Sequence, residues 1–117
     1  RFAINQACVE HRTPLVSGAA VRFEGQLSVF DSRQADSPCY RCLYEEGRDE
    51  DETCAANGVL SPIVGIIGAM QALAALWLVL ATGSNMSGSL LVFDGMTNEW
   101  RTLTLSRDPA CPVCRHK

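Results

Sequence analysis

Two pairs of cysteines are the residues of this sequence best suited to chemistry. One pair is Cys39 with Cys42, the other is Cys111 with Cys114, and two residues separate the members of each. Two such pairs can surround one tetrahedral zinc ion at Zn–S distances of about 2.3 Å. A site with four protein ligands is structural, because it leaves no position for water or substrate. The spacing therefore favours a structural zinc site that ties the end of the chain to its middle.

Two other uses of these pairs stay open on spacing alone, namely disulfides and redox-active thiols. A redox pair normally sits at a helix N-terminus, which lowers the pKa of its reactive thiol. Both pairs here lie in segments that contain proline, and no helix pattern follows either of them. The doubled pair makes zinc the preferred interpretation.

Two cysteines lie outside the pairs and differ in their surroundings. Cys8 sits among apolar residues of a helical segment and is expected to be a buried small hydrophobe. Cys54 follows an acidic run over residues 45–52. Neighbouring carboxylates raise the pKa of a thiol and so make it a poorer nucleophile at neutral pH. The only histidines of the sequence, His11 and His116, have no visible catalytic partner.

The elements that must position the cysteines mix helix and strand patterns, as in an α/β fold. The residue patterns predict a helix, two strands, a long irregular segment, a long helix and a final hairpin. Their predicted ranges are 2–10, 15–21, 23–30, 31–58, 59–81, 90–95 and 100–105. The irregular segment is longer than compact domains usually contain, and its acidic run indicates a solvated surface.

The segment 59–81 is the most apolar of the sequence and by length could span a bilayer. No Lys or Arg lies close to either end as an interfacial anchor, and Gly65 and Gly68 permit close helix approach in a soluble core. A buried helix of a soluble protein that ends at residues 82–85 is therefore preferred. The alternative is a small membrane protein built on this segment, which solubility without detergent would exclude.

Length and charge limit the classes of function. The 117 residues are enough for one domain or a piece of one. Ten Lys and Arg against thirteen Asp and Glu give a net charge of −3, so there is no basic footprint for nucleic acid or an anionic membrane. No glycine-rich phosphate loop occurs. The chain starts at Arg1 within a helix pattern and shows no signal peptide, so we expect it to be cut from a longer protein.

Seven short motifs, taken in order, resemble the C-terminal half of the MoeB/ThiF/HesA family over essentially the whole chain. The motifs are INQAC (4–8), PLVSGAA (14–20), EGQ (24–26), CYRCL (39–43), GVLSPIVGIIG (58–68), QAL (71–73) and CPVC (111–114). Members of this family adenylate the C-terminal glycine of a ubiquitin-like sulfur carrier, which is MoaD for molybdopterin and ThiS for thiamine. The resemblance therefore implies an adenylyltransferase that acts in molybdopterin or thiamine biosynthesis.

The resemblance also implies the fold and the sites. The chain would be the C-terminal half of a Rossmann-like adenylation domain, with a mixed sheet, a long buried helix and a structural zinc site at the four paired cysteines. Residues 1–117 would be one part of a single domain, with 31–58 as a loop that crosses over the active site. The half that binds ATP and Mg²⁺ would precede this chain, so the fragment alone is expected to be inactive. A thiol at Cys54 would take part in the covalent link to the carrier.

The resemblance leaves the carrier undecided between the two types. Ser17–Ala20 favours a MoaD-type carrier, whereas Phe93–Gly95 and Trp100–Arg101 favour a ThiS-type carrier. Contacts with the tail of the carrier are considered at Arg22 and Gln26, for which a surface or capping role is an equal alternative.

The resemblance further implies a homodimer. One departure from the family lies in the long helix, where Ala74 and Trp77 replace residues that are usually charged, which could mean a buried partner surface. Metal-bound rather than disulfide-bonded cysteines indicate the reducing cytoplasm. The alternative function is a non-catalytic, zinc-stabilised module that binds a carrier protein.

Overall fold

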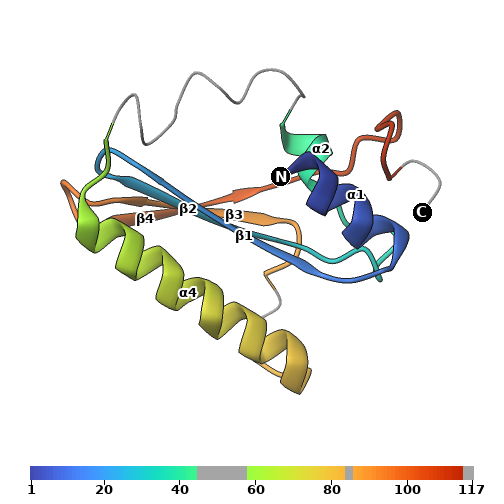
Figure 1. Cartoon of the computed structure of the whole chain (residues 1–117), viewed down its shortest axis with the longest axis horizontal. Coiled ribbons are helices and arrows are strands. Elements are labelled where there is room, and N and C mark those ends of the chain that lie inside the picture. Colours follow the sequence, from blue (N-terminus) through green and yellow to red (C-terminus); the bar gives the residue numbers. More distant parts are fainter. Residues whose placement is uncertain (45–57, 84–85, 115–117) are drawn as a thin grey trace.

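The computed structural model describes residues 1–44, 58–83 and 86–114. Two short helices, a long helix and four strands make up the described chain, which confirms an α/β fold. In chain order they are α1 (Phe2–Glu10), β1 (Leu15–Val21), β2 (Glu24–Phe30), α2 (Tyr40–Leu43), α4 (Ser61–Leu80), β3 (Ser89–Asp94) and β4 (Glu99–Thr104). Figure 1 shows α4 along one face of the sheet, while α1, α2 and the C-terminal turn gather at one end of the molecule.

The four strands form one sheet in the order β1-β2-β3-β4, and every neighbouring pair is antiparallel. The hairpin predicted at the end of the chain is confirmed, because β3 pairs with β4. The two strands predicted before it also form a hairpin, since β1 pairs with β2. The family resemblance implied a mixed sheet, whereas the four described strands pair only in the antiparallel direction. Among the described residues, parallel pairing is confined to two isolated bridges, Arg22 with Val59 and Val29 with Ser87.

Helix α4 packs on β1 and β2 through one stripe of side chains. Ile63 and Ile67 are 2% and 3% exposed and form a cluster with Phe93 of β3. Gly25 of β2 permits this close approach, since a Cβ atom there would lie 2.5 Å from Cγ1 of Ile67. The third buried residue of the stripe is Ala74, so this departure from the family faces the inside of the molecule.

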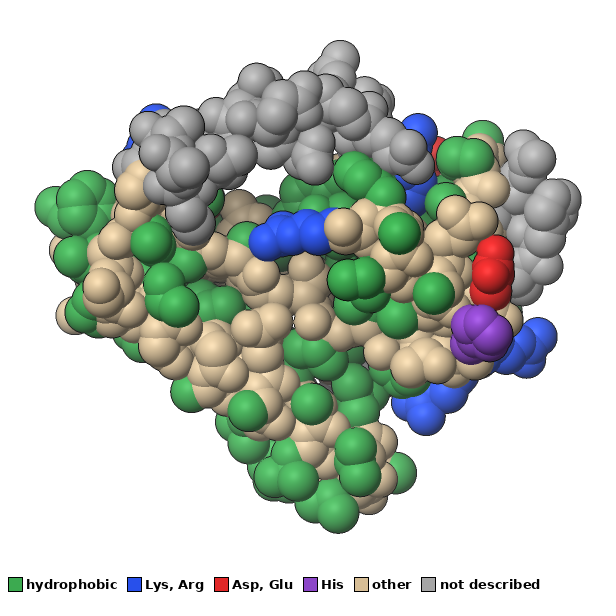
Figure 2. All heavy atoms as spheres, viewed as in Figure 1, with side chains coloured by type: hydrophobic (Ala, Val, Ile, Leu, Met, Phe, Trp, Pro, Cys, Tyr) green, Lys and Arg blue, Asp and Glu red, His purple; other side chains and the backbone are tan. Residues whose placement is uncertain are grey.

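The remaining faces of α4 are exposed, so the predicted helix is present but buried on one side only. Val64, Leu73, Leu76 and Val79 are all exposed, and Figure 2 shows hydrophobic side chains along the lower edge of the molecule, where α4 lies. Helix α4 has a mean hydropathy of 2.3, so by length and composition alone it could cross a membrane. Only 17% of this apolar stretch is buried inside the molecule. The mostly buried core helix of a soluble protein and a signal sequence near the N-terminus pass the same test.

Helix α4 ends at Leu80, within one residue of the predicted range, but the glycine and asparagine predicted to stop it are not the residues at its C-cap. Ala81 occupies the left-handed position at the end of α4, with φ of 54°. The backbone N–H of Thr82 then donates to the carbonyl of Trp77, as in a Schellman-type ending.

Candidate metal centre and groove

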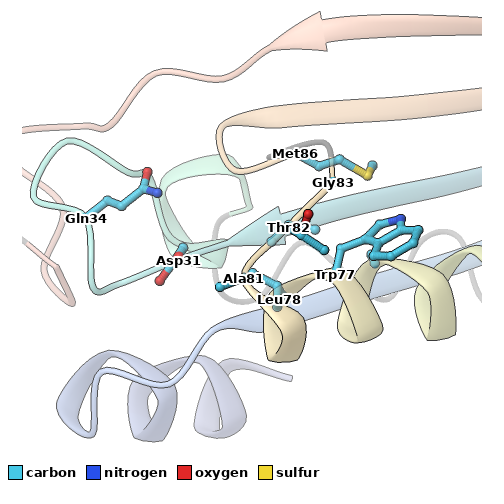
Figure 3. A pocket seen from close by; sticks show the side chains of 10 residues that line it. Asp31, Gln34, Trp77, Leu78, Ala81, Thr82, Gly83 and Met86 are labelled. Carbon is cyan, nitrogen blue, oxygen red and sulfur yellow. The ribbon is translucent and has the colours of Figure 1, made fainter.

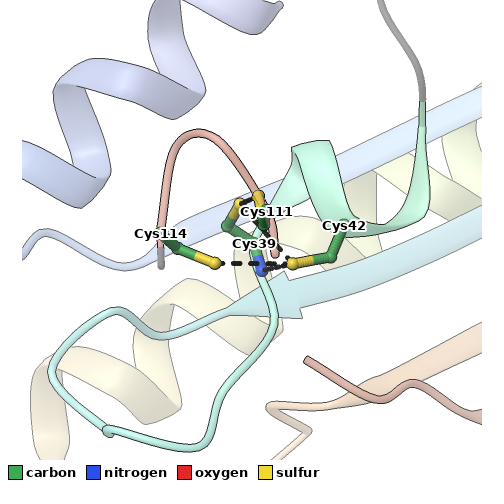
Figure 4. A group of neighbouring side chains, drawn as sticks. All are labelled: Cys39, Cys42, Cys111 and Cys114. Atoms are coloured by element: carbon green, nitrogen blue, oxygen red, sulfur yellow. Dashed lines mark hydrogen bonds between the residues drawn. The ribbon is translucent and has the colours of Figure 1, made fainter. Parts of the chain in front are cut away.

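Cys39, Cys42, Cys111 and Cys114, which we call the cysteine cluster, converge from two distant segments (Figure 4). The first pair belongs to α2, with Cys39 at the N-cap and Cys42 inside the helix. The second pair lies in the turn that follows β4. The fold therefore brings together the two cysteine pairs that the sequence singled out.

The spacing of the sulfur atoms fits a tetrahedral ion. Sγ of Cys39 lies 3.9 Å from that of Cys42 and 3.7 Å from that of Cys111, and Sγ of Cys42 lies 3.4 Å from that of Cys114. All four atoms lie within 4.8 Å of one another. A tetrahedron with Zn–S bonds of about 2.3 Å places its sulfur atoms about 3.8 Å apart. The cysteine cluster can therefore hold a metal ion such as zinc, with all four positions filled by protein.

Burial and hydrogen bonds together shift the pKa values of three of these thiols. Burial raises the pKa of Cys39, although a hydrogen bond from Asn5 opposes the shift. Burial also raises the pKa of Cys114, and the hydrogen bond with Cys42 adds to the increase. At Cys111 burial acts in the same direction, but hydrogen bonds from the N–H groups of Cys114 and Val113 contribute to a net lowering of the pKa. Metal binding would therefore have to displace protons from at least two of these thiols.

The structure corrects one step in the argument against a redox pair. A helix does start within the first cysteine pair, because α2 begins directly after Cys39 and contains Cys42. It is only four residues long, and the pKa of Cys39 is raised, whereas the thiol of a redox pair has a lowered pKa. The described cysteines are all free thiols and form no disulfide. The convergence of all four sulfur atoms thus favours metal binding over disulfide exchange.

Two polar side chains that the sequence argument missed hold the cysteine cluster in place. Asn5 of α1 is 1% exposed and donates to Sγ of Cys39 at 3.6 Å. Arg107 donates to the carbonyl of Ala35 at 2.9 Å and to the carbonyl of Cys114. Arg107 therefore ties the segment before the first pair to the second pair. The clue in the sequence is that it lies only four residues before Cys111.

Of the remaining candidate residues, neither Cys8 nor His11 belongs to the cysteine cluster. Cys8 of α1 is half-buried rather than fully buried, and His11 is exposed at the end of α1. Cys54 and His116 lie outside the described residues. The proposed role of Cys54 therefore remains a prediction.

A groove of about 650 Å³ opens on the face of the sheet opposite α4. We call it the sheet groove, and its polar walls are formed by Arg1, Arg22, Glu24, Gln26, Tyr40, Tyr44 and Asp94. Strand residues alternate between faces. Because Gly25 faces α4, its neighbours Glu24 and Gln26 point into the groove. The two residues considered for contact with the carrier, Arg22 and Gln26, therefore both line it.

A chain of hydrogen bonds organises the floor of the sheet groove. The hydroxyl of Tyr44 donates to Oε1 of Gln26 at 3.0 Å, and Nε2 of Gln26 donates to Glu24 at 3.1 Å. Burial raises the pKa of Tyr44, so its hydroxyl stays protonated and acts as a donor. The ring of Tyr44 also lies 4.5 Å from that of Tyr40, which precedes Cys42 in α2. The groove and the cysteine cluster thus share α2.

A second, smaller cavity of about 220 Å³ lies where α4 ends (Figure 3). Trp77 forms one wall and stands against Gly83, and Asp31 lies across from it. Both carboxylate oxygens of Asp31 already accept bonds from Arg33 at 2.9 Å. Most of the other residues that line this cavity are apolar. The described residues therefore give it no evident catalytic arrangement.

Comparison with known proteins gives matches over almost the whole chain. A family model described as the ThiF family matches residues 1–113. Molybdopterin-synthase adenylyltransferase of Salmonella typhimurium is 41% identical over 114 residues, and the match covers 97% of this chain and 45% of that protein. Sulfur carrier protein ThiS adenylyltransferase of Escherichia coli is 42% identical with the same coverage. Adenylyltransferase and sulfurtransferase MOCS3 of Caenorhabditis briggsae is 46% identical over 117 residues, and the match covers 97% of this chain and 29% of that protein.

Solved structures agree on the fold. Escherichia coli MccB crystallised with ATP superposes with a TM-score of 0.73 at 13% sequence identity, over 97% of this chain and 36% of MccB. The chain therefore spans less than half the length of the relatives compared here. The resemblance inferred from seven sequence motifs is confirmed: the chain belongs to the ThiF family.

Proposed function

We propose that the protein containing this chain is an ATP-dependent adenylyltransferase that activates the C-terminal glycine of a MoaD- or ThiS-type sulfur carrier. Residues 1–117 would form the C-terminal part of its single ThiF-type domain. The observation that carries this proposal is the family match over residues 1–113, together with relatives named as adenylyltransferases at 41–46% identity.

The chemistry divides between this chain and the rest of the protein. In adenylation, the carboxylate of the carrier attacks the α-phosphorus of ATP and pyrophosphate leaves. A sulfur nucleophile then attacks the resulting acyl adenylate and AMP leaves. The described residues offer no phosphate loop, so ATP and Mg²⁺ would be bound by residues outside this chain. This chain would instead position the carrier and stabilise the domain.

The sheet groove is the proposed site for the tail of the carrier. An extended tail that ends in glycine is narrow and presents polar backbone groups along its length. The groove offers amide, hydroxyl and guanidinium groups from Gln26, Tyr44 and Arg22 for such a backbone. Its volume of about 650 Å³ supports the binding of several residues.

Zinc is the proposed occupant of the cysteine cluster, since four thiolates in tetrahedral spacing suit this ion. When bound it would link α2 to the C-terminal turn, with no part in the reaction itself. The protein would be cytoplasmic, in keeping with the free thiols of its described cysteines. It would also form a homodimer, as the family resemblance implies. Cys54 would supply the thiol for the covalent link to the carrier.

The test is carrier-dependent exchange of labelled pyrophosphate into ATP by the intact protein. Exchange is expected with a MoaD-type or a ThiS-type carrier, and none with the same carrier lacking its terminal glycine. The 117 residues alone should give no exchange. Binding of both carriers without any exchange by the intact protein would contradict the proposal and favour the non-catalytic binding module. Robust exchange by the isolated 117 residues would refute the proposed division of labour.

Two arginines allow a matched test of the sheet groove. Arg22 and Arg12 both have positive φ, 57° and 53°, so alanine costs the backbone about the same at either position. Arg22 lines the groove, whereas Arg12 is exposed in the turn after α1. We expect Arg22→Ala to raise the KM for the carrier and Arg12→Ala to leave it unchanged. Equal effects from both variants would contradict the proposed location of the tail.

A further inference from the structure

One side-chain amide beside the cysteine cluster has both of its polar ends occupied. Asn5 is 1% exposed and is the only buried residue of α1. Its Oδ1 accepts from the backbone N–H of Tyr40 at 3.0 Å, and its Nδ2 lies 3.6 Å from Sγ of Cys39. A buried amide costs free energy unless it is hydrogen-bonded, so these two bonds account for its presence.

The orientation of this amide follows from its partners. The backbone N–H of Tyr40 can only donate, so the oxygen of Asn5 must face it. The NH₂ group is therefore left to donate to the sulfur of Cys39. A thiolate accepts such a bond far better than a thiol, because charge strengthens a hydrogen bond. An amide donor at this position thus suits a metal-bound sulfur.

The rest of the same face of α1 also points to the cluster. Phe2 stacks edge to face on Tyr40 with ring centroids 5.3 Å apart, and Val9 packs against the buried cysteines. Phe2, Asn5 and Val9 are spaced i, i+3 and i+7, which places them on one side of a helix. The packed side of α1 therefore faces both α2 and the cysteine cluster.

We propose that Asn5 is a positioning residue of the metal centre, which orients Cys39 through an N–H···S bond and couples α1 to the bound ion. This inference rests on the proposed occupation of the cysteine cluster by zinc. Partners of this kind typically change metal affinity on the order of 10- to 100-fold when they are removed. Loss of the metal should also loosen α1.

The test uses an isosteric substitution that removes only the donor. Asn5→Asp keeps an oxygen for the N–H of Tyr40 but places a second oxygen against the sulfur. Gln6→Glu is the matched control, since it makes the same chemical change on the exposed side of α1. In the intact protein, zinc affinity is measured by competition with a chromophoric chelator. We expect a fall on the order of 10- to 100-fold for Asn5→Asp and no change for Gln6→Glu.

A spectroscopic readout separates positioning from mere stability. With Co²⁺ in place of zinc, the lost N–H···S bond should move the sulfur-to-cobalt charge-transfer band to lower energy in Asn5→Asp only. Unchanged zinc affinity and an unchanged band in that variant would overturn the proposal. If Asn5→Asp does not fold, NMR spectroscopy of the unmodified protein loaded with ¹¹³Cd tests the N–H···S bond instead. Scalar coupling between ¹¹³Cd and the side-chain amide protons of Asn5 supports the bond, and its absence overturns it.

The metal content of the unmodified protein distinguishes failure of the proposed zinc centre from failure of the proposed role of Asn5. If that protein binds no metal, the proposed zinc centre fails and the role of Asn5 fails with it. If it binds one zinc ion per chain but Asn5→Asp behaves as Gln6→Glu does, only the role of Asn5 is overturned. Carrier adenylation is measured separately by pyrophosphate exchange, so failure of the proposed function is distinguished from failure of either metal result.

Discussion

The contact between Gly25 of β2 and Ile67 of α4 predicts a specific pattern of coupled mutations. Ile67 is 3% exposed, and truncation of a buried isoleucine to alanine costs about 2–5 kcal/mol of unfolding free energy. A Cβ atom added at Gly25 would lie 2.5 Å from Cγ1 of Ile67 and 3.1 Å from Cγ2 of Ile63. We expect Gly25→Ala to cost about 1–3 kcal/mol, because a packed core tolerates an extra methyl group poorly.

The double variant should be more stable than the sum of its parts. Once Ile67 is alanine, the shortest contact is gone and the new methyl group occupies space that the isoleucine left. The two substitutions should therefore couple favourably by about 1–3 kcal/mol, within the range seen for residues in direct contact. Urea unfolding of the two single variants, the double variant and the parent protein measures this coupling.

Ile66 provides the control, because it is the same residue type on the same helix but is 36% exposed. Ile66→Ala should combine with Gly25→Ala additively within about 0.5 kcal/mol. Additive behaviour of Gly25→Ala with Ile67→Ala would refute the packing described here. The result bears on function, since Gly25 lies between the two groove residues Glu24 and Gln26. A displaced β2 would move the floor of the sheet groove.

Three further outcomes follow from the cysteine cluster and its surroundings. Cys111→Ser should abolish stoichiometric zinc binding and lower the unfolding free energy, whereas Cys8→Ser, outside the cluster, should leave the zinc content unchanged; metal analysis and urea unfolding check both. Arg107→Met should cost about 1–3 kcal/mol, because two carbonyls lose a charged donor, and urea unfolding measures the loss. The pH dependence of stability should have opposite signs with and without metal. Without metal, the raised pKa values of Cys39 and Cys114 contribute stability that is present below the ordinary pKa of a thiol and is lost as pH rises through their folded-state pKa values. The lowered pKa of Cys111 opposes this trend but belongs to one thiol against two. With metal, stability is lost as pH falls, because protons compete for the thiolates. Chelator-treated and zinc-loaded samples unfolded across a pH series test this reversal.

Much of the fold could be predicted because its elements carry clear local patterns. The alternation of apolar and polar residues in β2 predicts a strand, and the long apolar run of α4 predicts a helix. Helix α2 could not be found this way, since four residues are too few to show a helical period. The end of α4 was predicted to within one residue, but its stop was assigned to residues 82–85, whereas Ala81 adopts the left-handed conformation directly after the helix.

The metal centre could be predicted from its ligands but not from its supports. Doubled cysteine spacing is a strong signal, and the structure brings all four sulfur atoms together. Asn5 and Arg107 carry no comparable signal, because a buried amide and a bridging guanidinium act through tertiary contacts with segments far along the chain. The sheet groove could not be predicted from the sequence for the same reason. Its walls come from the start of α1, the β1–β2 hairpin, α2 and the end of β3.

The central structural claim is that the cysteine cluster is one closed metal centre. Zinc K-edge X-ray absorption on the intact protein, purified without chelator, tests it most directly. We expect one zinc ion per chain with four sulfur neighbours at about 2.3 Å. Substoichiometric zinc, or a first shell that contains nitrogen or oxygen in place of sulfur, would contradict it.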